Sequence, residues 1–523
     1  MYMSSLRKCI QKDGMTLKVT SYLRERPSLY ARRNHILAEL IDIVGKNDVI
    51  DDEIELLAYS VHSIPLRKTG VARGEYLLVL GDYVVFPETT EEIQKIVRLA
   101  NRYKIPIIPY AGGSGVGCRP VFGGIMVDMK KMKRILEIDE ISQVVTVETG
   151  IYICELEEEL NRRGYEMKHL PASFFCACLG GFIANRSAGR LSTKYGKIED
   201  MVLGLKVVLP NGEVLKTPAV PGHAVGPDLK HLFIGSGGTL GVVTEATLKI
   251  YPIPEKRIFR SFLFPNLVEG LEAMREIMQS DLQPCLARLY DPIETSSEYF
   301  RFSLVPKEVS DKIERKKGCC YLVIGFDGPS RIVELYEKMA IEICLKHKAE
   351  DLGNEVGEYW WNHSLDDYYP GLNRPTRYSQ FFSDDVPYIY DVFDYCVLHK
   401  YSLKTWEEAQ EELKKTYKNS VFYGHFSHWY RNGTMMYPMV FVWGLQDDPK
   451  ELALAYEVAG SIVMRTAMKY GGVFQHHHGV GTLLGRFMAE QWGLSGYQTL
   501  LAIKKALDPN NIMNPGVLGF EAV

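Results

Sequence analysis

The sequence predicts an α+β protein with two main domains, the second built on an antiparallel sheet flanked by helices. The chain has 523 residues, which is more than one hydrophobic core usually holds. Up to about residue 255, short apolar runs typical of strands alternate with amphipathic helical patterns and glycine-rich segments. Beyond it, the strand-like runs 321–325 and 439–443 are each followed by a long helical pattern, 331–345 and 451–470.

Pro252 and Pro254 end the last strand-like run of the first half, and we place the main domain boundary there. The first 80 residues show a mostly helical pattern without recognisable chemistry. The predicted segments are 1–80 (a helical N-terminal extension), 81–255 (the first domain), 256–470 (the second domain) and 471–523 (a C-terminal segment).

The first domain begins with a strand, a helix and a second strand. Residues 84–87 predict the first strand, and Thr89 with Glu92 three residues later forms a capping box before an apolar helical stripe. Residues 105–108 predict the second strand. This strand runs directly into a glycine-rich loop, Pro109–Gly115.

Three glycines within four residues suit this loop to binding an anion. Glycine tolerates positive φ and leaves backbone N–H groups bare, as in known phosphate-binding turns. No Lys-Ser/Thr pair follows Gly115, which excludes a Walker A loop, and the spacing is not the G-x-G-x-x-G of a Rossmann turn. Alone, the loop fits a structural turn as well as a phosphate cradle.

Two further glycine-bounded segments, Gly180–Gly189 and Gly235–Thr244, lie beside strand-like runs in the same domain. Together, the three segments suit an extended, phosphate-bearing cofactor held by backbone amides in place of lysine or arginine side chains.

The order of these motifs resembles the vanillyl-alcohol-oxidase or PCMH-type flavoprotein family, from about residue 82 to 519. The other segments that carry the resemblance are 195–200, 210–212, 226–229, 508–509 and 514–516. The family implies a PCMH-type FAD-binding domain over 81–255, a substrate or cap domain over 256–470, and a C-terminal segment that completes the flavin site. The resemblance implies FAD contacts from Pro109, Tyr110, Ala111, Gly112, Gly113, Ser114, Gly115, Pro171, Ser173, Gly180, Gly181, Asn185, Ser187, Ala188, Gly235, Gly238, Thr239, Gly241, Val242, Val243 and Asn514.

The resemblance also bears on how FAD is attached. Family members that bind FAD covalently through this loop carry a histidine where this chain has Ser114, which favours non-covalent FAD. Some relatives attach FAD through a histidine of the cap domain, so His363, His425 and His428 stay open as attachment points.

A histidine triplet, His476-His477-His478, precedes Gly479. On a strand, the first and third histidines would face one way and the second the other, and no H-E-x-x-H motif or carboxylate pair stands nearby, so we predict no metal. Imidazoles of near-neutral pKa suit proton transfer beside a flavin ring. The triplet resembles the alkylglycerone-phosphate synthase branch of the family, whereas D-lactate and glycolate dehydrogenases usually carry a carboxylate before a single His-Gly.

Two more positions fit the same branch. Arg288 stands in a segment similar to the branch's arginine, whose guanidinium can hold a phosphate or carboxylate by a bidentate fork. Tyr430 aligns with a tyrosine proposed there as an acid or base. A surface arginine at a strand end and a half-buried core phenol are the alternatives.

These features predict an FAD-dependent oxidoreductase that oxidises a 2-hydroxy acid or alcohol by hydride transfer to flavin N5. Arg288 would hold an anionic group, and a base among Tyr430, His476, His477 and His478 would take the hydroxyl proton. The alternative is a transferase like alkylglycerone-phosphate synthase, which exchanges acyl for alkyl through a flavin adduct. The triplet favours this alternative, but residues 374–382 do not match the segment expected of that synthase.

The amino-acid composition limits the kinds of partner that we expect the protein to bind. Lys plus Arg number 61 against 65 Asp plus Glu, without a long run of either sign, so we expect a small-molecule substrate and no nucleic acid. Ten cysteines without a C-x-x-C pair favour a reducing cytoplasm. No apolar run is long enough to span a bilayer, and a peripheral membrane contact stays open. We expect a homodimer.

Overall fold

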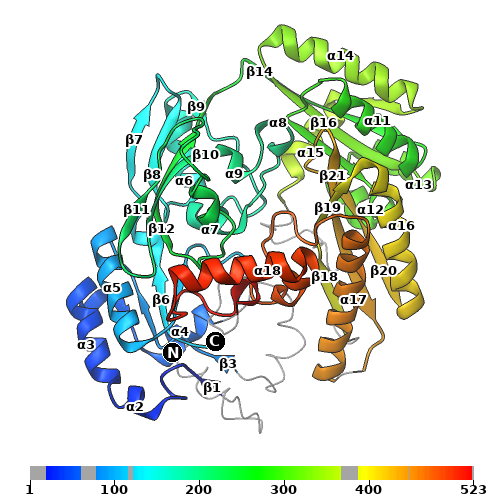
Figure 1. Ribbon diagram of the computed structural model, residues 1–523. Helices are drawn as coiled ribbons and strands as arrows, with labels where there is room; N and C mark the ends of the chain where they lie inside the picture. Colours follow the sequence, from blue (N-terminus) through cyan, green and yellow to red (C-terminus); the bar gives the residue numbers. More distant parts are fainter. Residues whose placement is uncertain (1–18, 61–77, 116–121, 367–386, 447, 521–523) are drawn as a thin grey trace, which may run out of the picture.

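The computed structural model describes residues 19–60, 78–115, 122–366, 387–446 and 448–520. The segment 374–382 therefore lies outside the described residues. In Figure 1 the sheets of the first half (blue to green) lie to the left and the large sheet of the second half to the right, with α18 (red) spanning the space between them. No helix among the described residues is both long and apolar enough to cross a membrane.

The first sheet has the strand order β2-β4-β6-β5. Its strands are β2 (Val49–Ile50), β4 (Tyr83–Val85), β5 (Ile107–Tyr110) and β6 (Ile125–Asp128). β4, β6 and β5 run parallel, and β2 joins antiparallel, so the N-terminal region predicted to be helical also supplies a strand. Half of the predicted capping box before helix α5 (Thr90–Tyr103) is present: Thr89 Oγ1 accepts from Glu92 N at 3.2 Å, whereas the Glu92 carboxylate accepts from Glu88 N, one residue before the N-cap, at 2.7 Å. The other elements of this part are β1 (Val19–Thr20), α2 (Pro27–Tyr30), α3 (Arg33–Val44), η1 (Lys46–Asp48), α4 (Glu53–Tyr59), β3 (Leu78–Val79) and η4 (Met129–Lys131).

The second sheet is antiparallel, with the order β11-β10-β12-β8-β7. Its strands are β7 (Ile135–Asp139), β8 (Val144–Glu148), β10 (Val202–Val208), β11 (Val214–Lys216) and β12 (Val242–Lys249). The second glycine-bounded segment forms helix α7 (Leu179–Asn185), and the third precedes β12. The remaining elements are α6 (Ile153–Arg162), β9 (Tyr165–Glu166), α8 (Ser192–Tyr195), α9 (Ile198–Met201), α10 (Lys230–Phe233) and β13 (Tyr251–Pro252).

The third sheet is the predicted antiparallel sheet flanked by helices, in the order β17-β14-β16-β15-β20-β21-β18, with β19 paired to β21. Its strands are β14 (Lys256–Phe264), β15 (Leu286–Tyr290), β16 (Cys320–Gly328), β17 (Glu350–Gly353), β18 (Tyr388–Val392), β19 (Tyr395–Leu398), β20 (Ser420–Ser427) and β21 (Gly433–Trp443). Its helices are α11 (Leu267–Gln279), α12 (Pro292–Ser296), η5 (Phe300–Leu304), α13 (Lys307–Arg315), α14 (Ser330–Lys346), α15 (Asn354–His363), α16 (His399–Thr416) and α17 (Pro449–Lys469). Apolar side chains of α11, α14, α16 and α17 pack with the strands into one large core.

The C-terminal residues return to the first sheet. After η6 (Gly485–Phe487) and α18 (Met488–Leu507), Ile107 N donates to Ile512 O at 2.6 Å and Asn514 N donates to Ile107 O at 2.8 Å. Buried Lys504 fixes this return, because its Nζ donates to the carbonyls of Thr239 (2.9 Å) and Met513 (2.8 Å). The chain ends its described part with η7 (Val517–Gly519).

A buried ionic cluster joins the first half of the chain to the third sheet. Lys168 Nζ lies 2.5 Å from Glu166 and 3.1 Å from Asp327 at the end of β16. Lys194 contacts the other oxygen of Asp327 at 2.9 Å, and Arg257 of β14 contacts both carboxylates. Burial alone would raise the pKa of Asp327, but Lys168 and Lys194 outweigh it and hold that pKa at about 2. The cluster therefore ties the two halves together.

Asp327→Asn is expected to lower the free energy of unfolding by about 3 kcal/mol, because buried cations lose their counter-charge. In the wild type, the lowered pKa of Asp327 gives stability that is present above the unfolded pKa, about 3.9, and lost as pH falls toward 2. Urea unfolding at pH 7 measures the effect of the substitution, and unfolding of the wild type at pH 7 and at about pH 2.5 measures the pH dependence. Asp281→Asn, at an exposed surface pair with Arg431, is the control and should change little. Equal losses in the two variants would contradict the role of the cluster.

Candidate active site

A cavity of about 720 Å³ lies where the first half of the chain, the third sheet and the C-terminal segment meet. Its walls come from several parts of the chain: the glycine-rich loop, segment 171–190, β15, β18, β20, and His477 and His478 of the histidine triplet. Several sites predicted separately from the sequence therefore open on one space.

The glycine-rich loop forms one wall through Ala111, Gly112, Gly113, Ser114 and Gly115. A Cβ on Gly112 would overlap the carbonyl oxygen of Cys176 and come within 2.8 Å of a neighbouring Cα. Gly113 has φ +67, where a side chain is strained and would overlap the ring of Tyr110. Only bare backbone fits here, which is the cradle that a pyrophosphate requires. Pro109 and Tyr110 belong to β5 and do not line the cavity.

The second glycine-bounded segment lies against the same space. The predicted cofactor residues that line the cavity in this region are Pro171, Ser173, Gly181, Asn185, Ser187 and Ala188. Gly180 lies behind them, where its N–H donates to Thr149 O at 2.8 Å. Small residues and backbone groups dominate this wall, in keeping with a flat, extended cofactor.

The third glycine-rich segment, Gly235–Thr244, contacts the second segment, Gly180–Gly189, on the side away from the cavity. It does not itself line the cavity. Gly235 N donates to Ile183 O at 2.9 Å, and Asn514 Nδ2 donates to Gly237 O at 2.7 Å. A Cβ on Gly238 would lie 3.2 Å from the ring of Pro109. The other predicted residues of this segment are buried or begin β12: Thr239, Gly241, Val242 and Val243.

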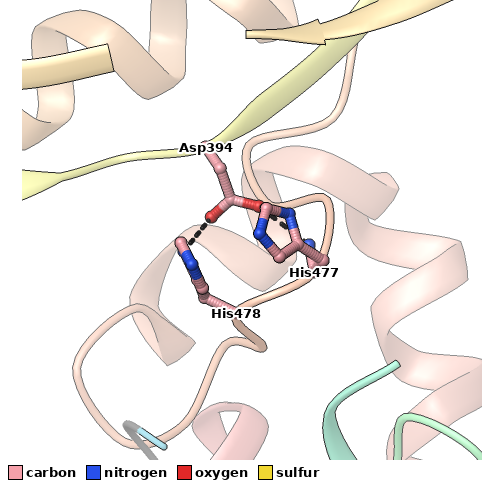
Figure 2. A group of neighbouring side chains, drawn as sticks. All are labelled: Asp394, His477 and His478. Atoms are coloured by element: carbon pink, nitrogen blue, oxygen red, sulfur yellow. Dashed lines mark hydrogen bonds and ion pairs between the residues drawn. The ribbon is translucent and has the colours of Figure 1, made fainter. Parts of the chain in front are cut away.

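The histidine triplet does not lie on a strand, so the alternation expected from a strand is wrong. Residues 476–478 form bends, and the three rings point to two places. His476 Nε2 lies 2.7 Å from Tyr430 Oη, and neither residue lines the cavity. His477 and His478 line the cavity and both approach Asp394, at 3.0 and 2.7 Å from Nδ1 (Figure 2).

Asp394 is the residue of this site that the sequence analysis missed. It is fully buried between β18 and β19 and also accepts from the backbone N–H groups of His476 (3.0 Å) and His477 (2.8 Å). Although burial opposes ionisation, His478 and His477 hold the pKa of Asp394 well below its usual range. A carboxylate thus stands at the base of the triplet.

The three donor groups in Figure 2 are of metal-binding types. Two ligands of one tetrahedral zinc ion lie about 3.3 Å apart, given bonds of about 2.0–2.1 Å. Asp394 lies closer than that to both imidazoles, at 2.7 and 3.0 Å, and one of its oxygens also accepts two backbone N–H groups. The geometry favours direct ion pairing over metal ligation.

Arg288 of β15 lines the cavity and pairs through its backbone with Ser427, the last residue of β20 before His428. Its Cζ lies 5.3 Å from the ring centre of Trp360, a favourable distance for a cation over an aromatic face. Among the described residues, no carboxylate lies within 4.0 Å of its side chain. Arg288 is therefore a cation suited to an anionic ligand.

Of the three histidines left open for covalent attachment, two line the cavity. His425 Nδ1 lies 3.0 Å from the buried carboxylate of Glu294. His428 has φ +50, a strained conformation for a non-glycine residue, and its Nδ1 bonds Ser192 Oγ. His363 lies on α15, bonds the carbonyl of Tyr359 at 2.7 Å and does not line the cavity.

A cavity lined by a bare glycine loop, by small residues, and by histidines and an arginine fits a flavin-dependent enzyme as the class of protein. Two family models match the chain: an FAD-binding domain over residues 81–218 and the C-terminal domain of FAD-linked oxidases over residues 253–518. The chain belongs to the FAD-linked oxidase family and binds FAD.

The proteins similar to this chain include both synthases and an oxidoreductase. An alkyldihydroxyacetonephosphate synthase from Dictyostelium discoideum is 31% identical over 463 residues, 83% of this chain and 72% of the relative. The "uncharacterized FAD-linked oxidoreductase YgcU" of Escherichia coli (strain K12) is 30% identical over 494 residues, 93% of this chain and 98% of the relative. A solved alkyldihydroxyacetonephosphate synthase is 28% identical with a TM-score of 0.74, covering 98% of this chain and 90% of that one.

Proposed function

We propose that the protein is an FAD-dependent oxidoreductase that oxidises an anionic hydroxy substrate, a 2-hydroxy acid or an alcohol. The observation that carries this proposal is that Arg288, His477 and His478 line the same cavity as the glycine-rich loop. In this proposal residues 81–255 hold the cofactor, 256–470 form the cap, and 471–523 complete the site.

The chain's own residues supply binding and proton transfer. The glycine-rich loop holds the pyrophosphate through backbone N–H groups, and Arg288 holds the anionic group of the substrate by charge-assisted hydrogen bonds. A histidine of the triplet accepts the proton of the substrate hydroxyl. Bound FAD supplies the hydride acceptor, and the residues around it orient the reacting carbon and exclude water.

FAD is bound without a covalent bond in this proposal. Ser114 stands in the loop that lines the cavity, and a hydroxyl offers no route to the histidyl linkage of the family. His425 and His428 line the cavity, but each has its Nδ1 engaged, by Glu294 and by Ser192. Acid precipitation should therefore release all of the flavin into the supernatant.

Anaerobic addition of hydroxy acids and aromatic alcohols to the FAD-loaded protein is expected to bleach its visible absorbance lastingly, as the flavin is reduced. Each substrate is paired with its analogue that lacks the hydroxyl group, which should leave the spectrum unchanged. Recovery of the oxidised spectrum on adding an electron acceptor completes the test. If the protein takes up FAD but none of these substrates reduces the flavin, the proposal is wrong.

A second candidate is an alkyl transferase that exchanges an acyl for an alkyl group without net oxidation. The His476–His478 triplet favours it, and so does the similarity of the chain to two alkyldihydroxyacetonephosphate synthases. With acyl-dihydroxyacetone phosphate, this activity predicts release of the free fatty acid and a flavin spectrum that changes without lasting reduction. The same anaerobic experiment thus separates the two candidates.

A further inference from the structure

The carboxylate of Asp394 meets two neighbouring histidines in different ways. Its Oδ2 lies 3.0 Å from His477 Nδ1 and also accepts the two backbone N–H groups of residues 476 and 477. Its Oδ1 lies 2.7 Å from His478 Nδ1, and no hydrogen bond from another described residue reaches that oxygen. The negative charge on Oδ2 therefore interacts with three N–H groups, whereas the charge on Oδ1 faces His478 alone among the described residues.

The contacts of His477 define its tautomer. A lone pair on Nδ1 would face the carboxylate of Asp394 and be repelled, so Nδ1 carries the hydrogen. His476 Nδ1, 3.1 Å away, then accepts, and its Nε2–H points to Tyr430 Oη. This leaves His477 Nε2 as the bare ring nitrogen, in a side chain that is 11% exposed and lines the cavity.

One carboxylate compensates one imidazolium, and the surroundings decide which ring carries the charge. His477 lies among the ammonium of Lys197, whose Nζ donates to His476 O at 2.6 Å, and the rings of His476 and His428. His478 has Asp394 at 2.7 Å and the carboxylate of Asp391 nearby, and the ring centre of Tyr437 lies 5.4 Å from its own ring centre. Electrostatics thus favours the charge on His478.

We propose that Asp394 is a positioning residue that gives two histidines of the triplet different roles. It orients neutral His477 as the base, and it holds His478 as a cation beside the substrate anion. This inference rests on the proposed oxidation. The substrate O–H bond breaks, its proton goes to His477 Nε2, and its electron pair forms the carbonyl as the hydride leaves carbon for the oxidised flavin. Atoms and electrons balance with these two acceptors.

The acid–base properties of the two rings agree with this division. Burial, with a further contribution from His478, lowers the pKa of His477 to about 4. Burial also acts to lower the pKa of His478, but Asp394 outweighs it and raises that pKa above 6.5. Two adjacent groups whose pKa values are driven apart are suited to opposite roles.

Asp394→Asn is expected to slow flavin reduction at saturating substrate by about 100-fold, the size of a general-base contribution. In the wild type, substrate affinity should weaken as pH rises through the pKa of His478, because the cation is lost. In the variant this weakening should move to lower pH, and Asp394→Glu should partly restore both properties. Stopped-flow reduction from pH 5 to 9 separates rate constant from Kd.

The matched control is Asp82→Asn, which also removes a buried carboxylate that accepts two backbone N–H groups, from Leu23 (3.2 Å) and Gly124 (2.8 Å). It does not line the cavity, so it should alter stability alone. If Asp394→Asn keeps the wild-type rate and pH dependence, or if Asp82→Asn reproduces its effects, the division of roles is wrong.

Histidine-selective isotope labelling of the resting FAD-bound protein gives a readout without turnover. Imidazole NMR signals, assigned with His477→Gln and His478→Gln, should show His478 doubly protonated at pH 6 and His477 neutral with its hydrogen on Nδ1. Asp394→Asn should neutralise His478. A charged His477, or a His478 indifferent to Asp394, would overturn the inference. Absence of flavin reduction by any substrate in wild type would instead count against the proposed function.

Discussion

Gly112→Ala is expected to give a folded protein that binds FAD more weakly than wild type, by up to about 100-fold. The new Cβ would overlap the carbonyl oxygen of Cys176, so the loop must move away from the wall it forms with residues 171–178. Overpacking of this kind costs about 1–3 kcal/mol, which is a factor of about 5 to 160 in Kd if it falls on the bound state. Flavin content on purification and titration of the apoprotein with FAD measure the loss.

Gly222→Ala is the control for this substitution, because a Cβ there meets no atom within 4 Å. It should retain FAD and the wild-type melting temperature. Circular dichroism of Gly112→Ala distinguishes a lost cofactor from a lost fold. Wild-type flavin content in Gly112→Ala would show that this loop does not form the cofactor cradle.

Arg288→Met is expected to raise the Kd of an anionic substrate by about 100-fold or more, while FAD content stays unchanged. The side chain faces the cavity without a described carboxylate within 4.0 Å, so its charge is available to a ligand. Charge-assisted hydrogen bonds contribute about 1.5–3 kcal/mol each, and a guanidinium makes two to one carboxylate or phosphate. Titration of the oxidised enzyme with a non-reducible anionic analogue measures the effect.

Arg288→Lys should recover only part of the affinity, because an ammonium keeps the charge but loses the planar fork. Arg275→Met, at an arginine of α11 paired with Glu272, controls for the loss of one positive charge. An uncharged alcohol should bind Arg288→Met and wild type alike. Equal loss of affinity for charged and uncharged substrates would mean that Arg288 supports the wall and does not hold an anion.

Elements with strong local patterns were predicted closely from the sequence. The strand predicted over 144–148 is β8 (Val144–Glu148), and the helix predicted over 331–345 is α14 (Ser330–Lys346). Periodicity, caps and prolines act within a few residues, so they are visible in the sequence. Strand order is not, because β12 pairs with both β10 and β8 through contacts that join distant segments.

The site shows the same limit at the scale of single residues. The triplet was recognisable because three histidines stand together, whereas Asp394 lies 82 residues before His476 without any local pattern around it. Tyr430 was predicted to act as an acid or base in the site, and His428, two residues earlier, was left open as a flavin attachment point; of the two, only His428 lines the cavity. β20 ends at Ser427 and His428 has φ +50, so the strand alternation that would relate the two side chains stops there.

The return of the last residues to the first sheet bears on how the protein is made. Ile107 lies in a strand synthesised early, but its backbone partners, Ile512 and Asn514, leave the ribosome some four hundred residues later. Until then the edge of β5, which leads into the glycine-rich loop, lacks its final hydrogen bonds. We therefore expect FAD to bind only after the chain is complete. A nascent or C-terminally truncated product should lack bound FAD and its yellow colour.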